Sequence, residues 1–126
     1  MPFVRIFVRA GTTPEYRKAL RDGVYRAMVE AIAIPADDRF VAVSEHSEVD
    51  LVYGPQYLGV HRSDRIAIVQ ITVSLGRNRR ENFFQRMAEI LSESPGLRTQ
   101  DLMTVVVETA WENWSFGNGE AHYMDR

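Results

Sequence analysis

Pro2 is the residue whose position could give it chemistry, because removal of Met1 would make it N-terminal. Its nitrogen would then be a secondary amine rather than an amide. An α-amino group titrates near ~8, close to working pH, so a neutral Pro2 can act as a base. A cationic Pro2 can act as an acid, as a charge or as a Schiff-base partner. If Met1 is retained, the nitrogen is a peptide amide and the site is inactive.

Other catalytic motifs do not occur in the sequence. The chain has no cysteine, which excludes thiol chemistry, disulfides and cysteine–zinc sites. Its histidines, His46, His61 and His122, are far apart and fit no metal-binding spacing, so we predict no metal. No nucleotide-binding or serine-hydrolase motif is present, and residues 117–119 (GNG) read as a turn, so we predict no cofactor.

The composition is typical of one soluble globular domain. The chain has 126 residues, 45% hydrophobic and 25% charged, which suits a single domain over 1–126. Its 15 Lys and Arg against 17 Asp and Glu give a net charge of −2, without a basic excess for nucleic acid or anionic membranes. No apolar run reaches the ~18–20 residues of a membrane span, and Arg5 and Arg9 interrupt any signal-peptide core. We therefore expect a cytoplasmic protein.

Two similar runs indicate an internal repeat. Residues 4–11 (VRIFVRAG) and 69–76 (VQITVSLG) are rich in β-branched residues and end in glycine. Each precedes a helical pattern and then a second β-rich run, at 39–44 in the first half and at 102–108 in the second. Each half therefore reads as a β-α-β unit.

The helical segments have recognisable ends. Thr13 and Pro14 open the first helix, which should end before Pro35. Asn78 could cap the second, which residues 95–96 (Pro-Gly) stop. The predicted divisions of the chain are a β-α-β unit at 1–44, an insertion at 45–64, a β-α-β unit at 65–108 and an aromatic C-terminal arm at 109–126.

The repeat predicts an α/β (α+β) fold with one uncovered sheet face. A crossover helix in each unit implies parallel strands within it, and two units most simply form a four-stranded mixed sheet with both helices on one face. Phe3, Phe7, Phe40 and Ile68 then lie on the other face, where exposure would cost about 1.5–3 kcal/mol each. We therefore predict a homo-oligomer whose partner subunit covers this face. The alternative is that the insertion and the tail cover it.

Two segments outside the repeat are rich in aromatic residues. The insertion contains Tyr53, Gly54-Pro55 and Tyr57, and reads as an ordered loop with short strands. Residues 111–123 (WENWSFGNGEAHY) contain two Trp, one Phe, one Tyr and two Gly. This tail is either a hydrophobic arm that docks on a neighbour or an aromatic wall for a small substrate.

Three motifs, residues 34–40 (IPADDRF), Gly76-Arg77 and residues 112–119 (ENWSFGNG), resemble the tautomerase superfamily. Within it the chain is similar to the malonate semialdehyde decarboxylase branch over nearly its whole length. The resemblance implies a tandem β-α-β fold, a homotrimer, a small oxo-carboxylate substrate and an N-terminal catalytic proline.

The resemblance also implies roles for particular residues. The catalytic proline falls on Pro2, an aspartate on Asp38 and a carboxylate-binding arginine on Arg77, with Trp114 and Phe116 as an apolar wall that binds substrate. Asp38 would orient water or keep Pro2 charged, because a nearby carboxylate favours the cation.

The sequence departs from the branch at one point. Some of its decarboxylases carry two arginines flanking a proline, whereas residues 75–77 read Leu-Gly-Arg. Arg79 is a candidate substitute for the missing arginine. Asp37 competes with Asp38, which could instead be a turn residue that pairs with Arg39 or Arg17.

Three functions follow from these residues. The first is that of a lyase: decarboxylation of a 3-oxo acid such as malonate semialdehyde, with Arg77 on the carboxylate and a cationic Pro2 on the carbonyl. The second is that of an isomerase: keto–enol tautomerisation of a phenylpyruvate-like 2-oxo acid by a neutral Pro2, with a hydratase side activity. The third is a non-catalytic oligomeric binding protein, which retention of Met1 would favour.

Overall fold

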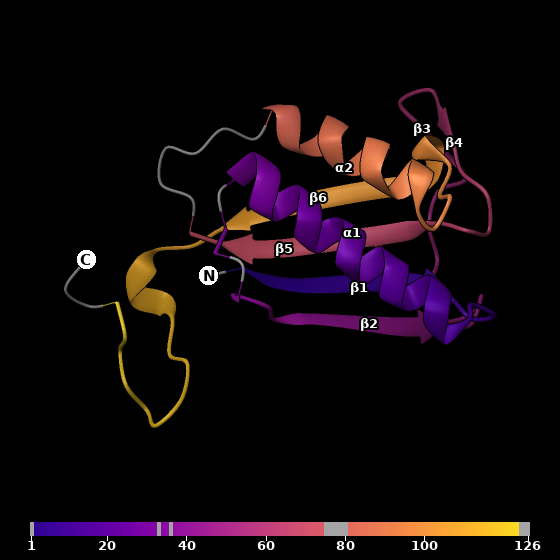
Figure 1. The fold of residues 1–126 in the computed structure, drawn as a ribbon. Helices are drawn as coiled ribbons and strands as arrows, with labels where there is room; N and C mark the ends of the chain where they lie inside the picture. Colours follow the sequence, from indigo (N-terminus) through magenta and orange to yellow (C-terminus); the bar gives the residue numbers. More distant parts are fainter. Residues whose placement is uncertain (1, 33, 36, 75–80, 124–126) are drawn as a thin grey trace.

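Four strands form one mixed sheet in the order β2-β1-β5-β6 (Figure 1). The computed structural model describes residues 2–32, 34–35, 37–74 and 81–123. Strand β1 (Phe3–Arg9) pairs in parallel with β2 (Val41–His46) and antiparallel with β5 (Ala67–Val73). Strand β5 pairs in parallel with β6 (Leu102–Glu108). The predicted four-stranded mixed sheet is confirmed.

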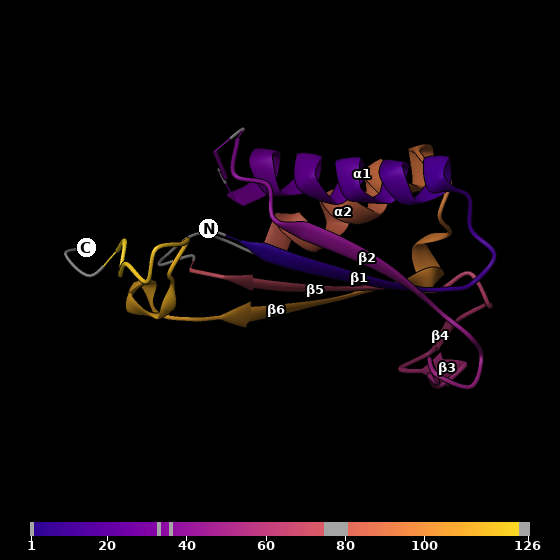
Figure 2. The same ribbon diagram turned by 90° about the horizontal axis from the view of Figure 1, so that it is seen from below.

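Both long helices cover one face of the sheet, as Figures 1 and 2 show. Helix α1 (Pro14–Ile32) begins where the Thr13 hydroxyl accepts the Tyr16 N–H at 3.1 Å, which caps its first turn. Helix α2 (Glu81–Glu93) ends before the Pro-Gly pair, as predicted. The predicted start of this second helix at Asn78 lies outside the described residues.

Strand boundaries differ from the predictions by two residues or so. β1 and β5 begin earlier than the repeat suggested, because pairing continues to Phe3↔Thr72 at one end and Val8↔Ala67 at the other. The predicted strand at 39–44 is shifted to 41–46. The turn at residues 37–39 delays its start, and the Ala10 N–H bonds the His46 carbonyl at 2.8 Å at its end.

The core lies between the sheet and the helices. Alternate strand residues face it, because successive side chains of a strand point to opposite sides of a sheet. Its fully buried large side chains include Val4, Ile6, Leu20, Val24, Ile66, Val69, Ile71, Val73, Phe83, Met87 and Leu91.

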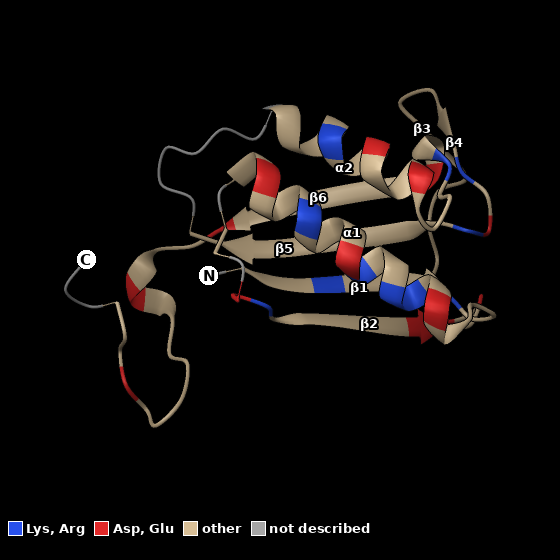
Figure 3. Ribbon diagram, in the orientation of Figure 1, with Lys and Arg blue, Asp and Glu red and all other residues tan. Residues whose placement is uncertain are grey.

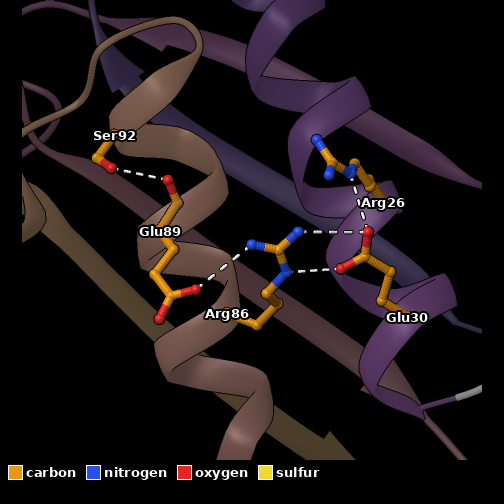
Figure 4. Close-up of polar contacts among 5 residues, drawn as sticks. All are labelled: Arg26, Glu30, Arg86, Glu89 and Ser92. Atoms are coloured by element: carbon orange, nitrogen blue, oxygen red, sulfur yellow. Dashed lines mark hydrogen bonds and ion pairs between the residues drawn. The ribbon is translucent and has the colours of Figure 1, made fainter.

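The helices pack closely and are joined by an ion-pair network. A Cβ built on Gly23 of α1 would lie 2.6 Å from Leu91 Cδ2 of α2, so the glycine permits the close approach. Figure 4 shows Arg86 of α2 donating from Nε to the Glu30 carboxylate of α1 at 2.6 Å, with Arg26 donating to the same group at 2.9 Å. The hydrogen bond from Arg86 lowers the pKa of Glu30 the most, and the hydrogen bond from Arg26 lowers it further. Charges are frequent along both helices in Figure 3.

The opposite face of the sheet carries exposed apolar residues. Met103, Val105 and Val107 of β6 are 37–40% exposed, and Phe3 is 42% exposed. Phe7 and Ile68, also predicted on this face, are half-buried. The insertion reaches Met103, which lines a pocket with Tyr53 and Tyr57, whereas Val105 and Val107 remain exposed.

The insertion forms a small hairpin on this same side of the sheet (Figure 2). Strands β3 (Gln56–Tyr57) and β4 (Val60–His61) pair antiparallel, which confirms the predicted short strands. Two short 3-10 helices, η1 (Thr99–Asp101) and η2 (Trp111–Asn113), flank β6. Among the described residues, no helix has both the length and the apolar character needed to cross a membrane.

Candidate active site

Four chain segments meet at one end of the sheet. There β1 and β2 begin and β5 and β6 end, because β1 is parallel to β2 and antiparallel to β5 (Figure 1). Pro2 is buried and directly precedes Phe3, which pairs with Thr72 near the end of β5. On the other side, the Val4 N–H donates to the Phe40 carbonyl at 2.8 Å. Pro2 therefore lies between the end of β5 and the segment that leads into β2.

Asp38 lies at this same end of the sheet. Its N–H donates to the Pro35 carbonyl at 3.1 Å in a tight turn, and its side chain is half-buried. The competing residue, Asp37, is exposed. The parallel pairing of β1 and β2 places residues 38–40 alongside the start of β1, which the sequence could not establish.

The two arginines considered as partners of Asp38 have carboxylates of their own. Arg17 lies 3.1 Å from Glu45, and Arg39 lies 3.7 Å from Asp22. A hydrogen bond from the Thr12 hydroxyl is the main cause that lowers the pKa of Glu45. Each of these arginines therefore has a carboxylate partner besides any contact with Asp38.

The tail forms an aromatic cluster at this end. The rings of Trp114 and Phe116 are stacked, with centroids 5.7 Å apart and an interplanar angle of 1°. Phe40 contacts Phe116 with centroids 5.7 Å apart, and Tyr123 and His122 meet the same ring edge-on. Phe116 thus joins the tail to Phe40, in the segment before β2.

Ser74 holds the tail against the end of β5, a role that sequence reasoning missed. The side chain is buried, its hydroxyl donates to the Thr109 carbonyl at 2.6 Å, and it accepts the Trp114 indole N–H at 2.9 Å. A serine at a strand end gives no sequence signal for this role, because the same residue type is common in exposed turns.

The rest of the tail closes into a loop. The Phe116 N–H donates to His122 Nδ1 at 3.1 Å, and His122 Nε2 lies 3.4 Å from Glu120. The predicted turn at 117–119 is confirmed, with positive φ at all three residues. His122, which the sequence offers only as a metal ligand, thus contacts both the backbone of Phe116 and the side chain of Glu120.

Arg77 and Arg79 lie outside the described residues. Within the part of the chain that the structure describes, no three His, Asp or Glu side chains converge on a possible metal site. Pro2, Asp38, Trp114 and Phe116 are therefore the predicted site residues that share one end of the sheet.

The chain belongs to the tautomerase family. Two family models, each described as tautomerase enzyme, match residues 38–117 and 2–61. The probable tautomerase YrdN of Bacillus subtilis (strain 168) is 30% identical over 98% of this chain and 97% of its own length. The chain is therefore an enzyme of this superfamily.

Solved structures specify the branch. A malonate semialdehyde decarboxylase, described with decarboxylase and hydratase activities, has a TM-score of 0.86 and 28% identity over 96% of this chain and 95% of that one. A second malonate semialdehyde decarboxylase, inhibited by 3-bromopropiolate, has a TM-score of 0.80 and 33% identity, and the match covers 96% of this chain and 93% of that one. The chain is a member of the malonate semialdehyde decarboxylase-like branch. A fused 4-OT, solved as a symmetric trimer, shares the fold. It has a TM-score of 0.76 and 20% identity, and the match covers 98% of this chain and 99% of that one.

Proposed function

We propose that this enzyme decarboxylates a small 3-oxo acid of the malonate semialdehyde type, with Pro2 as its catalytic group. The observation that carries the proposal is the meeting of a buried Pro2, the Asp38 turn and the Trp114–Phe116 wall at one end of the sheet. Two relatives of this branch are malonate semialdehyde decarboxylases, which supports the choice of substrate.

The reaction needs a place for the electron pair that carbon dioxide leaves behind. Arg77, which follows β5 in the sequence, would bind the carboxylate by a bidentate contact. Cationic Pro2 would donate a hydrogen bond to the 3-oxo oxygen, so that the C1–C2 bond breaks, carbon dioxide leaves and the electron pair moves into an enolate between C2 and C3. A proton from water then adds at C2 to give acetaldehyde, and Pro2 keeps its own proton. Asp38 would favour the cationic form of Pro2.

Trp114 and Phe116 would exclude water from the carboxylate. A carboxylate is best stabilised in water, whereas carbon dioxide is neutral, so an apolar wall favours the product side of the step. The stacked pair offers such a wall, with the indole N–H already bonded to Ser74 rather than available to solvate the substrate.

A keto–enol tautomerase of a phenylpyruvate-like 2-oxo acid is the second candidate. YrdN, a relative of similar length, carries the name probable tautomerase. A hydratase side activity would use the same residues.

The test is product formation followed by proton NMR with malonate semialdehyde and phenylenolpyruvate, side by side. Intact mass first establishes that Met1 is removed. We expect wild type to act on the first substrate, and Pro2→Ala and Arg77→Ala each to reduce turnover at least 100-fold. Pro14→Ala, at the first turn of α1, is the matched control. Retained Met1, or a Pro2→Ala variant as active as wild type, would leave the non-catalytic binding protein as the better hypothesis.

We also propose that the enzyme is a cytoplasmic homotrimer. The exposed apolar residues of β6 support an oligomer, because a water-facing patch of this kind is typical of a subunit interface. A fused 4-OT of the same fold is a symmetric trimer. The tail would complete the site of its own subunit, since its contacts with Ser74 and Phe40 lie within one chain.

A further inference from the structure

The turn that carries Asp38 lies between α1 and β2 and belongs to neither element. Helix α1 ends at Ile32, and β2 begins at Val41. Asp38 is half-buried, and its N–H donates to the Pro35 carbonyl at 3.1 Å. A carboxylate that acts on a neighbouring charge must be kept at a fixed distance from it, and a turn fixes a side chain less well than a helix or a strand does. Contacts between this turn and the helix layer therefore decide where Asp38 lies.

Tyr25 of α1 contacts the turn on one side of Asp38. Its hydroxyl donates to the Pro35 carbonyl at 2.9 Å, so one oxygen accepts both the tyrosine hydroxyl and the Asp38 N–H. A carbonyl oxygen has two lone pairs and can accept both bonds. The helix is thus joined to the turn at the carbonyl that holds the backbone of Asp38.

The ring of Tyr25 contacts the turn on the other side of Asp38. The Arg39 guanidinium lies over this ring, with Cζ 4.2 Å from the ring centroid. Arg39 Nη1 is also 3.7 Å from the carboxylate of Asp22, which precedes Tyr25 in α1. A guanidinium within about 6 Å of an aromatic face is attracted by the ring. Tyr25 therefore contacts the turn both before and after Asp38, once with its hydroxyl and once with its ring.

Tyr25 is itself firmly placed. Its ring packs against the hydrophobic core, and its neighbours on α1, Val24 and Met28, are buried. Tyr25, Met28 and Arg39 line a pocket between α1 and the start of β2. This pocket leaves space into which the turn could move, so the contacts of Tyr25 limit that movement.

The end of the turn is joined to β1. The Val4 N–H donates to the Phe40 carbonyl at 2.8 Å, and Val4 is two residues after Pro2. The segment from Pro35 to Phe40 is therefore attached to the helix layer at one end and to the strand that follows Pro2 at the other. The place of Asp38 relative to Pro2 depends on both attachments.

We propose that Tyr25 is a positioning residue that holds Asp38 where its carboxylate stabilises the cationic form of Pro2. This inference rests on the proposed function, in which a cationic Pro2 acts on the 3-oxo oxygen. Tyr25 acts through the turn and not on the substrate. Because the attraction between two charges falls with distance, a displaced Asp38 stabilises the cation less.

The test variant is Tyr25→Phe, which removes the hydroxyl and keeps the ring under Arg39. The Pro2 nitrogen is titrated by NMR in protein labelled with nitrogen-15 proline, after intact mass has shown that Met1 is removed. We expect the pKa of Pro2 to fall by about 0.5 unit. Activity with malonate semialdehyde requires the cation, so its loss on raising the pH should begin at a pH lower by the same amount.

Tyr16→Phe is the matched control. Tyr16 also lies on α1, and the Arg65 guanidinium is 5.2 Å from its ring centroid. It lines a pocket with Val8 and Arg9, at the end of β1 that is remote from Pro2. The pKa of Pro2 and the pH profile should therefore stay as in wild type.

A double-variant cycle separates positioning from a general loss of structure. Asp38→Asn should lower the pKa of Pro2 more than Tyr25→Phe does, and the two changes together should lower it no further, because no carboxylate is left to position. A wild-type pKa in Tyr25→Phe, or shifts that simply add, would overturn the inference and leave the proposed function standing. An unchanged pKa in Asp38→Asn would remove the role proposed for Asp38 and the role of Tyr25 with it. Loss of activity in Pro2→Ala is independent of these results.

Discussion

Replacement of Asp101 by alanine should destabilise the protein through the base of the hairpin. Its carboxylate is fully buried and accepts two hydrogen bonds from Ser63, with Arg98 Nη1 3.7 Å away. Hydrogen bonds to a charged group contribute roughly 1.5–3 kcal/mol each, and relief of the buried charge offsets part of their loss. We expect a net loss of about 2–4 kcal/mol, or roughly 10 °C in Tm for a chain of this size.

Urea denaturation at several protein concentrations is the appropriate assay, because assembly makes apparent stability depend on concentration. Asp101→Asn keeps an acceptor for the Ser63 N–H and should lose about half as much. Asp64→Ala, an exposed neighbour, is the control. A loss below about 0.5 kcal/mol for Asp101→Ala would refute the reasoning, since it would mean that water replaces both bonds without cost. Hydrogen exchange should show the insertion opening first.

Three further predictions concern the helices and the tail. Gly23→Ala should lower the free energy of unfolding by a net ~1 kcal/mol, because overpacking against Leu91 at about 1–3 kcal/mol outweighs a helix-propensity gain of ~1 kcal/mol; a stabilised variant in urea denaturation would contradict this. Arg86 is the main cause that lowers the pKa of Glu30 in the folded protein. The resulting stability is fully present above the unfolded pKa of ~4.3, and it is lost as the pH falls through the lower folded pKa. Glu30→Gln should therefore flatten stability against pH below about 5, and an unchanged acid profile would count against the pair. Ser74→Ala should shift tryptophan emission to the red and lower kcat, since it removes the indole acceptor; unchanged emission would show that the tail is held by ring contacts alone.

The repeat was readable in the sequence because its pattern follows from local geometry. Strands β1 and β5 alternate between a buried and an open face, so their apolar residues recur at every second position. The first helix was bounded by Thr13 and Pro35, whose effects on the backbone are local. The start of β2 was less predictable, since the turn at 37–39 uses backbone hydrogen bonds.

The site was only partly predictable because it depends on pairing between distant segments. That Asp38 shares an end of the sheet with Pro2 follows from the parallel register of β1 and β2, which no local pattern encodes. The contact between Phe40 and Phe116 likewise joins residues far apart in the chain. The family resemblance supplied the roles proposed for Pro2 and Asp38, whereas Ser74 had no signal of its own.

The two β-α-β units are related by an approximate two-fold axis between the antiparallel strands β1 and β5, so the sheet has two topologically equivalent ends. After β2 the chain builds the uncharged hairpin, and after β6, at the opposite end, it builds the aromatic tail. One end of the sheet therefore carries a hairpin and the other carries the residues proposed for catalysis, although both ends are built from the same β-α-β unit.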